Sequence, residues 1–127
     1  MARPQTEAYP REWQKKAEAD YRRVGLRLRE GDVEDAAVHL QQALEKFLKA
    51  FLLARGWSLK KTHDLEALLD DAVRYEPGLE VWRKLVAGVT GYYLPARYPS
   101  LGRNPSRVEV KGSADRAKDL VAFLRHL

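Results

Sequence analysis

Apolar residues recur at helical spacing along most of the chain, and the pattern is strongest between Asp32 and Gly56. With successive residues about 100° apart, the apolar side chains of this stretch share a little over half of the helix circumference. A surface helix needs a narrower stripe, so we expect at least two other helices to cover this one. Asp32 is a suitable N-cap and Gly56 a suitable terminator. The sequence therefore predicts a central helix over residues 32–56.

The same periodicity predicts four more helices around it. The first covers residues 10–30 and, because only Gly31 follows it, forms an antiparallel hairpin with the central helix. The others begin at Thr62, at about Leu79 and at Ser113, with Thr62 and Ser113 as N-caps. No segment alternates as a strand does. We predict an all-α, five-helix up-and-down antiparallel bundle in a single domain, 1–127, with residues 1–9 as an N-terminal tail.

Residues 95–112 interrupt the helical pattern and form a proline-rich, basic loop. Three prolines and two glycines prevent a regular helix, while Arg97, Arg103, Arg107 and Lys111 supply positive charge. A connection of this length without secondary structure is typical of functional or disordered segments.

The polar face of the central helix mixes apolar and charged residues. It carries Val38, Gln42, Glu45, Lys49 and Leu53. One interpretation is a solvated face with a Glu45–Lys49 pair at i,i+4 spacing, worth a few tenths of a kcal/mol. The other is a dimer or partner face, because Val38 and Leu53 are poorly placed in water and the polar residues could bond to a second chain.

Composition excludes several classes of function. There is no cysteine, so disulfides and thiolate metal sites are excluded, and His39, His63 and His126 lack any metal-binding spacing. We find no phosphate-binding loop, dinucleotide fingerprint or nucleophile elbow. We therefore expect no metal, no other cofactor and no standard enzyme chemistry. The N-terminus has no apolar core and no apolar run has membrane-spanning length, so we expect a cytoplasmic protein without a membrane partner.

The chain is basic, with a net charge of +5 from 23 Lys and Arg against 18 Asp and Glu. Arginine favours bidentate contacts with phosphate or carboxylate, so an anionic partner is permitted. Arg22, Arg23, Arg27 and Arg29 of the first helix are poorly balanced by acids. They form either a solvated face or the contact surface for such a partner.

Two polar or aromatic motifs are candidates for chemistry. His63, in the sequence Lys-Thr-His-Asp-Leu, either closes the first turn of a helix or stands at the mouth of a pocket near the end of the central helix. Tyr92, Tyr93, Arg97 and Tyr98 form either a stacking and phosphate-binding cluster or an aromatic lid over the core.

Three segments together resemble the HEPN domain, named for nucleotide binding in higher eukaryotes and prokaryotes. They are HLQQALEKFLKAFLLARG (39–56), KTHDLEALL (61–69) and YYLPARYP (92–99). The resemblance implies a helical bundle that commonly forms homodimers. It also implies a partner, since members are often encoded beside a minimal nucleotidyltransferase in toxin–antitoxin-type or nucleotide-binding pairs.

The resemblance also assigns residues. Gln42, Glu45, Lys46 and Lys49 match polar positions of the family's helix, and the remaining motifs match His63, Asp64, Tyr93, Arg97 and Tyr98. Of these, we expect a nucleotide or other anion to bind at Lys46, Lys49, His63, Tyr93, Arg97 and Tyr98. Many HEPN proteins are metal-independent RNases that use an Arg followed by a His after four to six residues. Arg97 fits the arginine, but Gly102, Arg103 and Asn104 stand where the histidine is required.

We therefore expect a non-catalytic HEPN module that binds a nucleotide, RNA or a partner protein, paired with a minimal nucleotidyltransferase in a toxin–antitoxin-like system. No catalytic residue is assigned. One alternative is a metal-independent RNase toxin with a non-standard site, and another is a purely structural dimeric scaffold.

Overall fold

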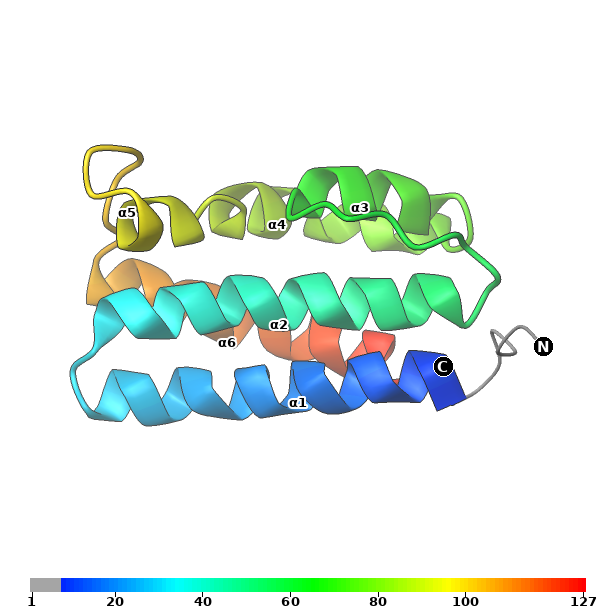
Figure 1. The fold of residues 1–127 in the computed structure, drawn as a ribbon, viewed down its shortest axis with the longest axis horizontal. Helices are drawn as coiled ribbons and strands as arrows, with labels where there is room; N and C mark the ends of the chain where they lie inside the picture. Colours follow the sequence, from blue (N-terminus) through cyan, green and yellow to red (C-terminus); the bar gives the residue numbers. More distant parts are fainter. Residues whose placement is uncertain (1–7) are drawn as a thin grey trace.

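The computed structural model describes residues 8–127, and the helices of that range run along one common axis (Figure 1). In chain order they are α1 (Ala8–Arg29), α2 (Val33–Leu53), α3 (Leu65–Val73), the 3-10 helix η1 (Pro77–Trp82), α4 (Arg83–Val89), α5 (Tyr93–Arg97) and α6 (Arg107–Leu124). The described residues contain no strand, so the predicted all-α bundle is confirmed. Of the predicted tail, residues 1–7 lie outside the described residues, while Ala8 and Tyr9 already belong to α1.

Helix α2 lies between the other helices, with α1 on one side and α3 to α5 on the other (Figure 1). Fourteen of its 21 residues are buried, which is more than a single apolar stripe provides. Its large side chains, from Leu40 to Phe51, form the centre of one continuous core. The prediction of a central helix covered from several sides is confirmed.

The α1–α2 hairpin is closed by a three-residue turn. Gly31 has φ of 81°, and its N–H and that of Asp32 bond to the carbonyls of Leu28 and Arg27 at 3.1 and 2.9 Å. This is the Schellman arrangement, in which glycine takes the left-handed conformation that L-residues avoid. The Asp32 carboxylate then accepts the Asp35 N–H at 3.1 Å, so one residue ends the turn and caps α2.

The connection from α2 to α3 differs from a simple hairpin. After Gly56, residues 57–64 run back alongside α2, so that α3 starts near the middle of α2 and points in the same direction (Figure 1). The cap of α3 is Asp64, two residues after the predicted Thr62, because the Asp64 carboxylate accepts the N–H groups of Glu66 and Ala67. Thr62 instead accepts the Asp64 N–H at 3.1 Å.

Two contacts to one carboxylate hold this returning segment against α3. The Trp57 indole N–H and the Lys60 ammonium both donate to Asp71 at 2.9 Å. The Lys60 ammonium, with help from the Trp57 indole, holds the pKa of the Asp71 carboxyl below its ordinary value. Residues 57–64 are therefore fixed where they pass the middle of α2.

The predicted helix from Leu79 to Leu94 is interrupted. Thr90 adopts ψ of 135° and Gly91 has φ of 89°, which separates α4 from α5. The Thr90 hydroxyl accepts the Leu65 N–H at 3.1 Å, so the break is used to cap the start of α3. The interruption also turns α5 toward the N-terminal half of α2 (Figure 1).

The predicted N-cap of the last helix, Ser113, is wrong. Helix α6 begins seven residues earlier, where the Ser106 hydroxyl accepts the Glu109 N–H at 3.1 Å. Ser106 and Glu109 have the spacing of a capping box, and the helix tolerates Gly112 in its interior. The predicted loop 95–112 is therefore reduced to residues 98–106 between α5 and α6. In the described part of the chain, no helix is both long and apolar enough to cross a membrane.

Candidate functional site

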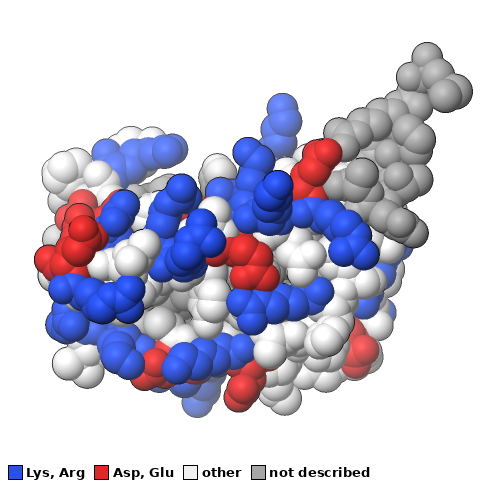
Figure 2. All heavy atoms as spheres, turned by 90° about the horizontal axis from the view of Figure 1, so that it is seen from below, with Lys and Arg blue, Asp and Glu red and all other residues white. Residues whose placement is uncertain are grey.

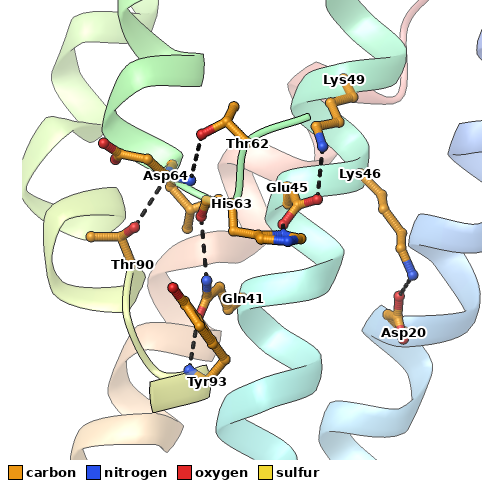
Figure 3. Close-up of polar contacts among 11 residues, drawn as sticks. Asp20, Gln41, Glu45, Lys46, Lys49, Thr62, His63, Asp64, Thr90 and Tyr93 are labelled. Carbon is orange, nitrogen blue, oxygen red and sulfur yellow. Dashed lines mark hydrogen bonds and ion pairs between the residues drawn. The ribbon is translucent and has the colours of Figure 1, made fainter. Parts of the chain in front are cut away.

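A polar stripe runs along α2 on the side that faces residues 57–64 and α5 (Figure 3). It consists of Gln41, Glu45 and Lys49, which are 2, 7 and 3% exposed. Their four-residue spacing places them on one face of the helix. Burying an amide and two charged groups is costly unless each finds a partner, so their contacts define the site.

Glu45 is the centre of this stripe. Its Oε2 accepts a bond from the Lys49 ammonium at 2.9 Å, and its Oε1 lies 2.9 Å from Nδ1 of His63 (Figure 3). Lys49 also lies over the Trp13 ring, with 5.3 Å from Nζ to the ring centroid. The carboxylate thus joins a buried cation to an imidazole that belongs to another segment.

Gln41 ties the segment of His63 to α5. Its side-chain oxygen accepts the Tyr93 N–H at 2.8 Å, and its side-chain nitrogen donates to the His63 carbonyl at 3.4 Å. Each contact satisfies a backbone group that no regular helix pairs, since Tyr93 opens α5 and His63 precedes α3. The amide therefore fixes the distance between the two segments.

The His63 imidazole faces solvent. Its side chain is 66% exposed, and its ring lies 6.0 Å from the Tyr93 ring at an interplanar angle of 53°. Because Glu45 engages Nδ1, the ring is oriented and Nε2 is left on the solvent side. An oriented imidazole beside a phenol ring can stack on a base, donate to a phosphate oxygen or exchange a proton.

Arg97 and Tyr98 lie at the end of the same short helix as Tyr93. Arg97 is four residues beyond Tyr93, which places their Cβ atoms about 6 Å apart on one face of α5. Both Arg97 and Tyr98 are exposed, and no described residue engages the Arg97 guanidinium in an ion pair or hydrogen bond. We call the surface formed by His63, Tyr93 and Arg97 the His63 face, and Tyr98 directly follows Arg97 in the chain.

Two lysines predicted to bind an anion are engaged inside the protomer. Lys49 is buried and donates to Glu45, so it does not present its ammonium to the surface. Lys46 points to the other side of α2, where it donates to the buried carboxylate of Asp20 (Figure 3). Nδ1 of His39 also lies 2.9 Å from Asp20. Lys46 therefore belongs to a second polar cluster that joins α1 to α2.

Most of the predicted dimer or partner face is buried within the protomer. Glu45, Lys49 and Leu53 are 3 to 7% exposed; Trp13 of α1 lies against Lys49, and His63 of the returning segment contacts Glu45. Only Val38 and Gln42 are half-buried and reach the surface. Burial inside the protomer removes Leu53 from the argument about poorly placed apolar residues, whereas Val38 still reaches the surface, and dimerisation stays a prediction.

Tyr92 belongs to the core rather than to the His63 face. It is 6% exposed, and its hydroxyl lies 3.3 Å from both Glu109 and Ser113. Burial raises the pKa of the Tyr92 phenol. Of the two interpretations of the aromatic cluster, Tyr92 fits the lid, whereas Tyr93 contributes to the surface.

Gln41, Trp13 and Asp20 take part in these contacts although the sequence pattern does not single them out as site residues. For Gln41, the sequence does contain a signal: Gln41, Glu45 and Lys49 recur every four residues within an otherwise apolar helix. Trp13 and Asp20 give no such signal, because their partners lie on another helix. Within residues 8–127, no group of three His, Asp or Glu side chains converges to hold a metal ion.

Comparison with known proteins agrees with the all-α fold. The HEPN domain family model matches residues 10–127. A solved structure described as TT1696 from Thermus thermophilus is similar in fold, with a TM-score of 0.79 and 30% sequence identity over 91% of this chain and 95% of that chain. No curated protein matches the sequence.

Proposed function

Because the chain belongs to the HEPN domain family, we propose that it is a non-catalytic binding module for a phosphate-bearing ligand, either a nucleotide or an RNA strand. The observation that carries the proposal is the His63 face. It combines the oriented His63 imidazole with the Tyr93 ring and Arg97. No carboxylate of the described residues engages the Arg97 guanidinium.

The parts of this face have complementary roles. The rings of His63 and Tyr93 offer flat surfaces to a base, and the Arg97 guanidinium suits a phosphate through paired N–H donors. Glu45 contacts His63 and Gln41 accepts the Tyr93 N–H, so α2 fixes the positions of the two segments that carry these rings. Lys49 supports the same arrangement by neutralising Glu45 and is a structural residue in this proposal.

Replacing Arg97 tests the proposal. We expect Arg97→Ala to weaken binding of ATP or of a short single-stranded RNA about tenfold at low salt, because a charge-assisted phosphate contact is lost. The free energy of unfolding should change by less than about 0.5 kcal/mol, since the side chain is exposed. Isothermal titration calorimetry measures the first quantity and urea unfolding the second.

Arg74→Ala is the matched control, because Arg74 is also exposed but lies at the end of α3, away from the His63 face. The control should bind as the unmodified protein does. Equal affinity of the Arg97 and Arg74 variants for both ligands would remove the phosphate role of Arg97.

A second candidate is metal-independent RNA cleavage, and the Glu45–His63 contact favours it. A carboxylate that orients an exposed imidazole is an arrangement suited to general acid–base catalysis. If this candidate is correct, the protein cleaves mixed RNA in the presence of EDTA, and His63→Ala and Arg97→Ala each abolish cleavage. Binding of RNA without cleavage selects the non-catalytic module instead.

We further propose that the protein forms a homodimer and pairs with a minimal nucleotidyltransferase in a toxin–antitoxin-like system. Family membership supports both proposals, and half-buried Val38 and Gln42 mark where a second chain can still contact α2. Light scattering of the purified protein and co-purification with a co-expressed nucleotidyltransferase from the same gene neighbourhood test them. Assembly together with no affinity for nucleotide or RNA would select the structural scaffold.

A further inference from the structure

A groove lies between α1 and α6 on the side of the molecule away from α3. Both helices pack against α2 and leave between them a cavity of about 450 Å³. Its volume is in the range of specific binding sites. Its walls carry cationic residues of both helices: Arg22 and Arg29 of α1, and Arg107, Lys111 and Lys118 of α6.

The rim of the groove is strongly basic. Five of the lining residues are cationic and only Asp115 is acidic. Asp115 is engaged by Lys111 at 3.0 Å and by Lys118 at 3.7 Å. Within the described residues, no carboxylate engages Arg22 or Arg29. Figure 2 shows this underside of the molecule, where Lys and Arg side chains outnumber Asp and Glu.

The floor of the groove is aliphatic and open. Val24 and Leu28 are 3 and 6% exposed and form the edge of the core beneath it. Gly25 has no side chain and Ala114 only a methyl group, and both residues are half-buried. A Cβ added to Gly25 would meet only the guanidinium of Arg29, at 3.8 Å, so the space above the glycine is free of backbone. The apolar side chains of a binding partner can therefore approach the backbone of α1 closely.

We propose that the groove between α1 and α6 binds an amphipathic helix of a partner protein, whose apolar stripe is flanked by Asp and Glu. The stripe packs on Val24, Gly25 and Ala114, and the carboxylates pair with the basic rim. Arg107 crosses one end of the groove, where its guanidinium donates to the Leu28 carbonyl of α1. From Arg107 to Lys118, α6 runs eleven residues, which corresponds to about 16 Å or three helical turns. This proposal uses a different surface from the His63 face and does not depend on the proposed function.

The chemistry of the floor favours a protein helix over a nucleic-acid strand. Sites for single strands combine positive charge with aromatic faces on which bases stack. Tyr21 is the aromatic residue that lines the groove, and its ring packs edge-on against Phe47 at 6.2 Å and 81°.

The test uses a labelled helical peptide of about 20 residues, with Leu at i, i+3, i+4 and i+7 positions and Glu on both sides of that stripe. Binding is measured by fluorescence anisotropy. Two groove variants address the two parts of the contact. Arg22→Glu with Lys118→Glu reverses charge on both walls, and Gly25→Leu fills the floor. Leucine has a higher helix propensity than glycine, so the second variant is expected to fold, which circular dichroism checks.

Each groove variant should weaken peptide binding about tenfold or more, because it removes either the charge pairing or the space for the apolar stripe. Lys15→Glu with Lys84→Glu makes the same change in net charge on exposed residues outside the groove, and should change affinity less than about threefold. A second peptide with Lys in place of Glu should not bind.

Three results would overturn the proposal. The first is no binding of the Glu peptide to the unmodified protein. The second is equal loss of affinity in the groove variants and the Lys15/Lys84 control. The third is tighter binding of a single-stranded RNA of about 15 nucleotides than of the peptide, lost in the same groove variants, which assigns the groove to nucleic acid.

Discussion

Lys49→Met is expected to reduce the free energy of unfolding by about 3 kcal/mol at neutral pH, because it leaves the buried Glu45 carboxylate without its cation. Lys49 and Glu45 are 3 and 7% exposed, and 2.9 Å separates the ammonium from the carboxylate. The contact between Glu45 and His63 remains and prevents a larger loss. Urea unfolding monitored by circular dichroism measures the change.

The exposed pair Lys111–Asp115 is a matched control. It has the same i,i+4 spacing and a distance of 3.0 Å, but its side chains are 60 and 48% exposed. Lys111→Met should cost less than about 0.5 kcal/mol, because water already solvates both charges. The double variant Glu45→Leu, Lys49→Met should recover most of the lost stability, since it removes both buried charges together. Equal costs for Lys49→Met and Lys111→Met would contradict the buried ion pair.

Phe47→Ala is expected to reduce the free energy of unfolding by about 4 kcal/mol. Phe47 is fully buried at the middle of α2, and its ring packs against Tyr21 of α1 in an edge-on contact. Truncation loses the burial of the ring and leaves a cavity that helices packed on several sides cannot close. A domain of this size is stable by about 5–15 kcal/mol, so the loss is a large share of the total.

Phe123→Ala is the matched control, because it makes the same substitution at a partly exposed site and so isolates the effect of burial. Phe123 lies on α6 and is 37% exposed, although it contacts the rings of Phe51 and Trp82. It should cost about 1 kcal/mol, because less area is buried and solvent fills the space. Comparable losses from the two truncations, measured by urea and thermal unfolding, would mean that α2 is not the centre of the core.

The contrast between Ser113 and Ser106 shows where local sequence signals mislead. Residues 95–112 contain helix breakers, so the local pattern predicts a loop that ends at Gly112. The capping box of Ser106 and Glu109 is present in the sequence, and a helix that packs on α2 accommodates an interior glycine. Packing therefore overrides a weak local preference. The same competition separates α4 from α5, because the Thr90 hydroxyl accepts the Leu65 N–H at the start of α3.

The sequence by itself determined the all-α class, the α1–α2 hairpin and the central position of α2. These features follow from local signals, namely apolar periodicity, an Asp32 cap and glycines at two helix ends, which need no partner elsewhere in the chain. The resemblance to the HEPN family was also readable from segment order, and the family model confirms it.

Only the tertiary structure decided how the site is built. Whether Lys49 meets a ligand or a carboxylate depends on residues 57–64 folding back over α2, and whether Lys46 is available depends on Asp20 of α1. The groove between α1 and α6 likewise joins residues about 90 positions apart in sequence. Such contacts arise from the packing of whole helices, and the side-chain spacing within one helix does not encode which neighbour it will meet.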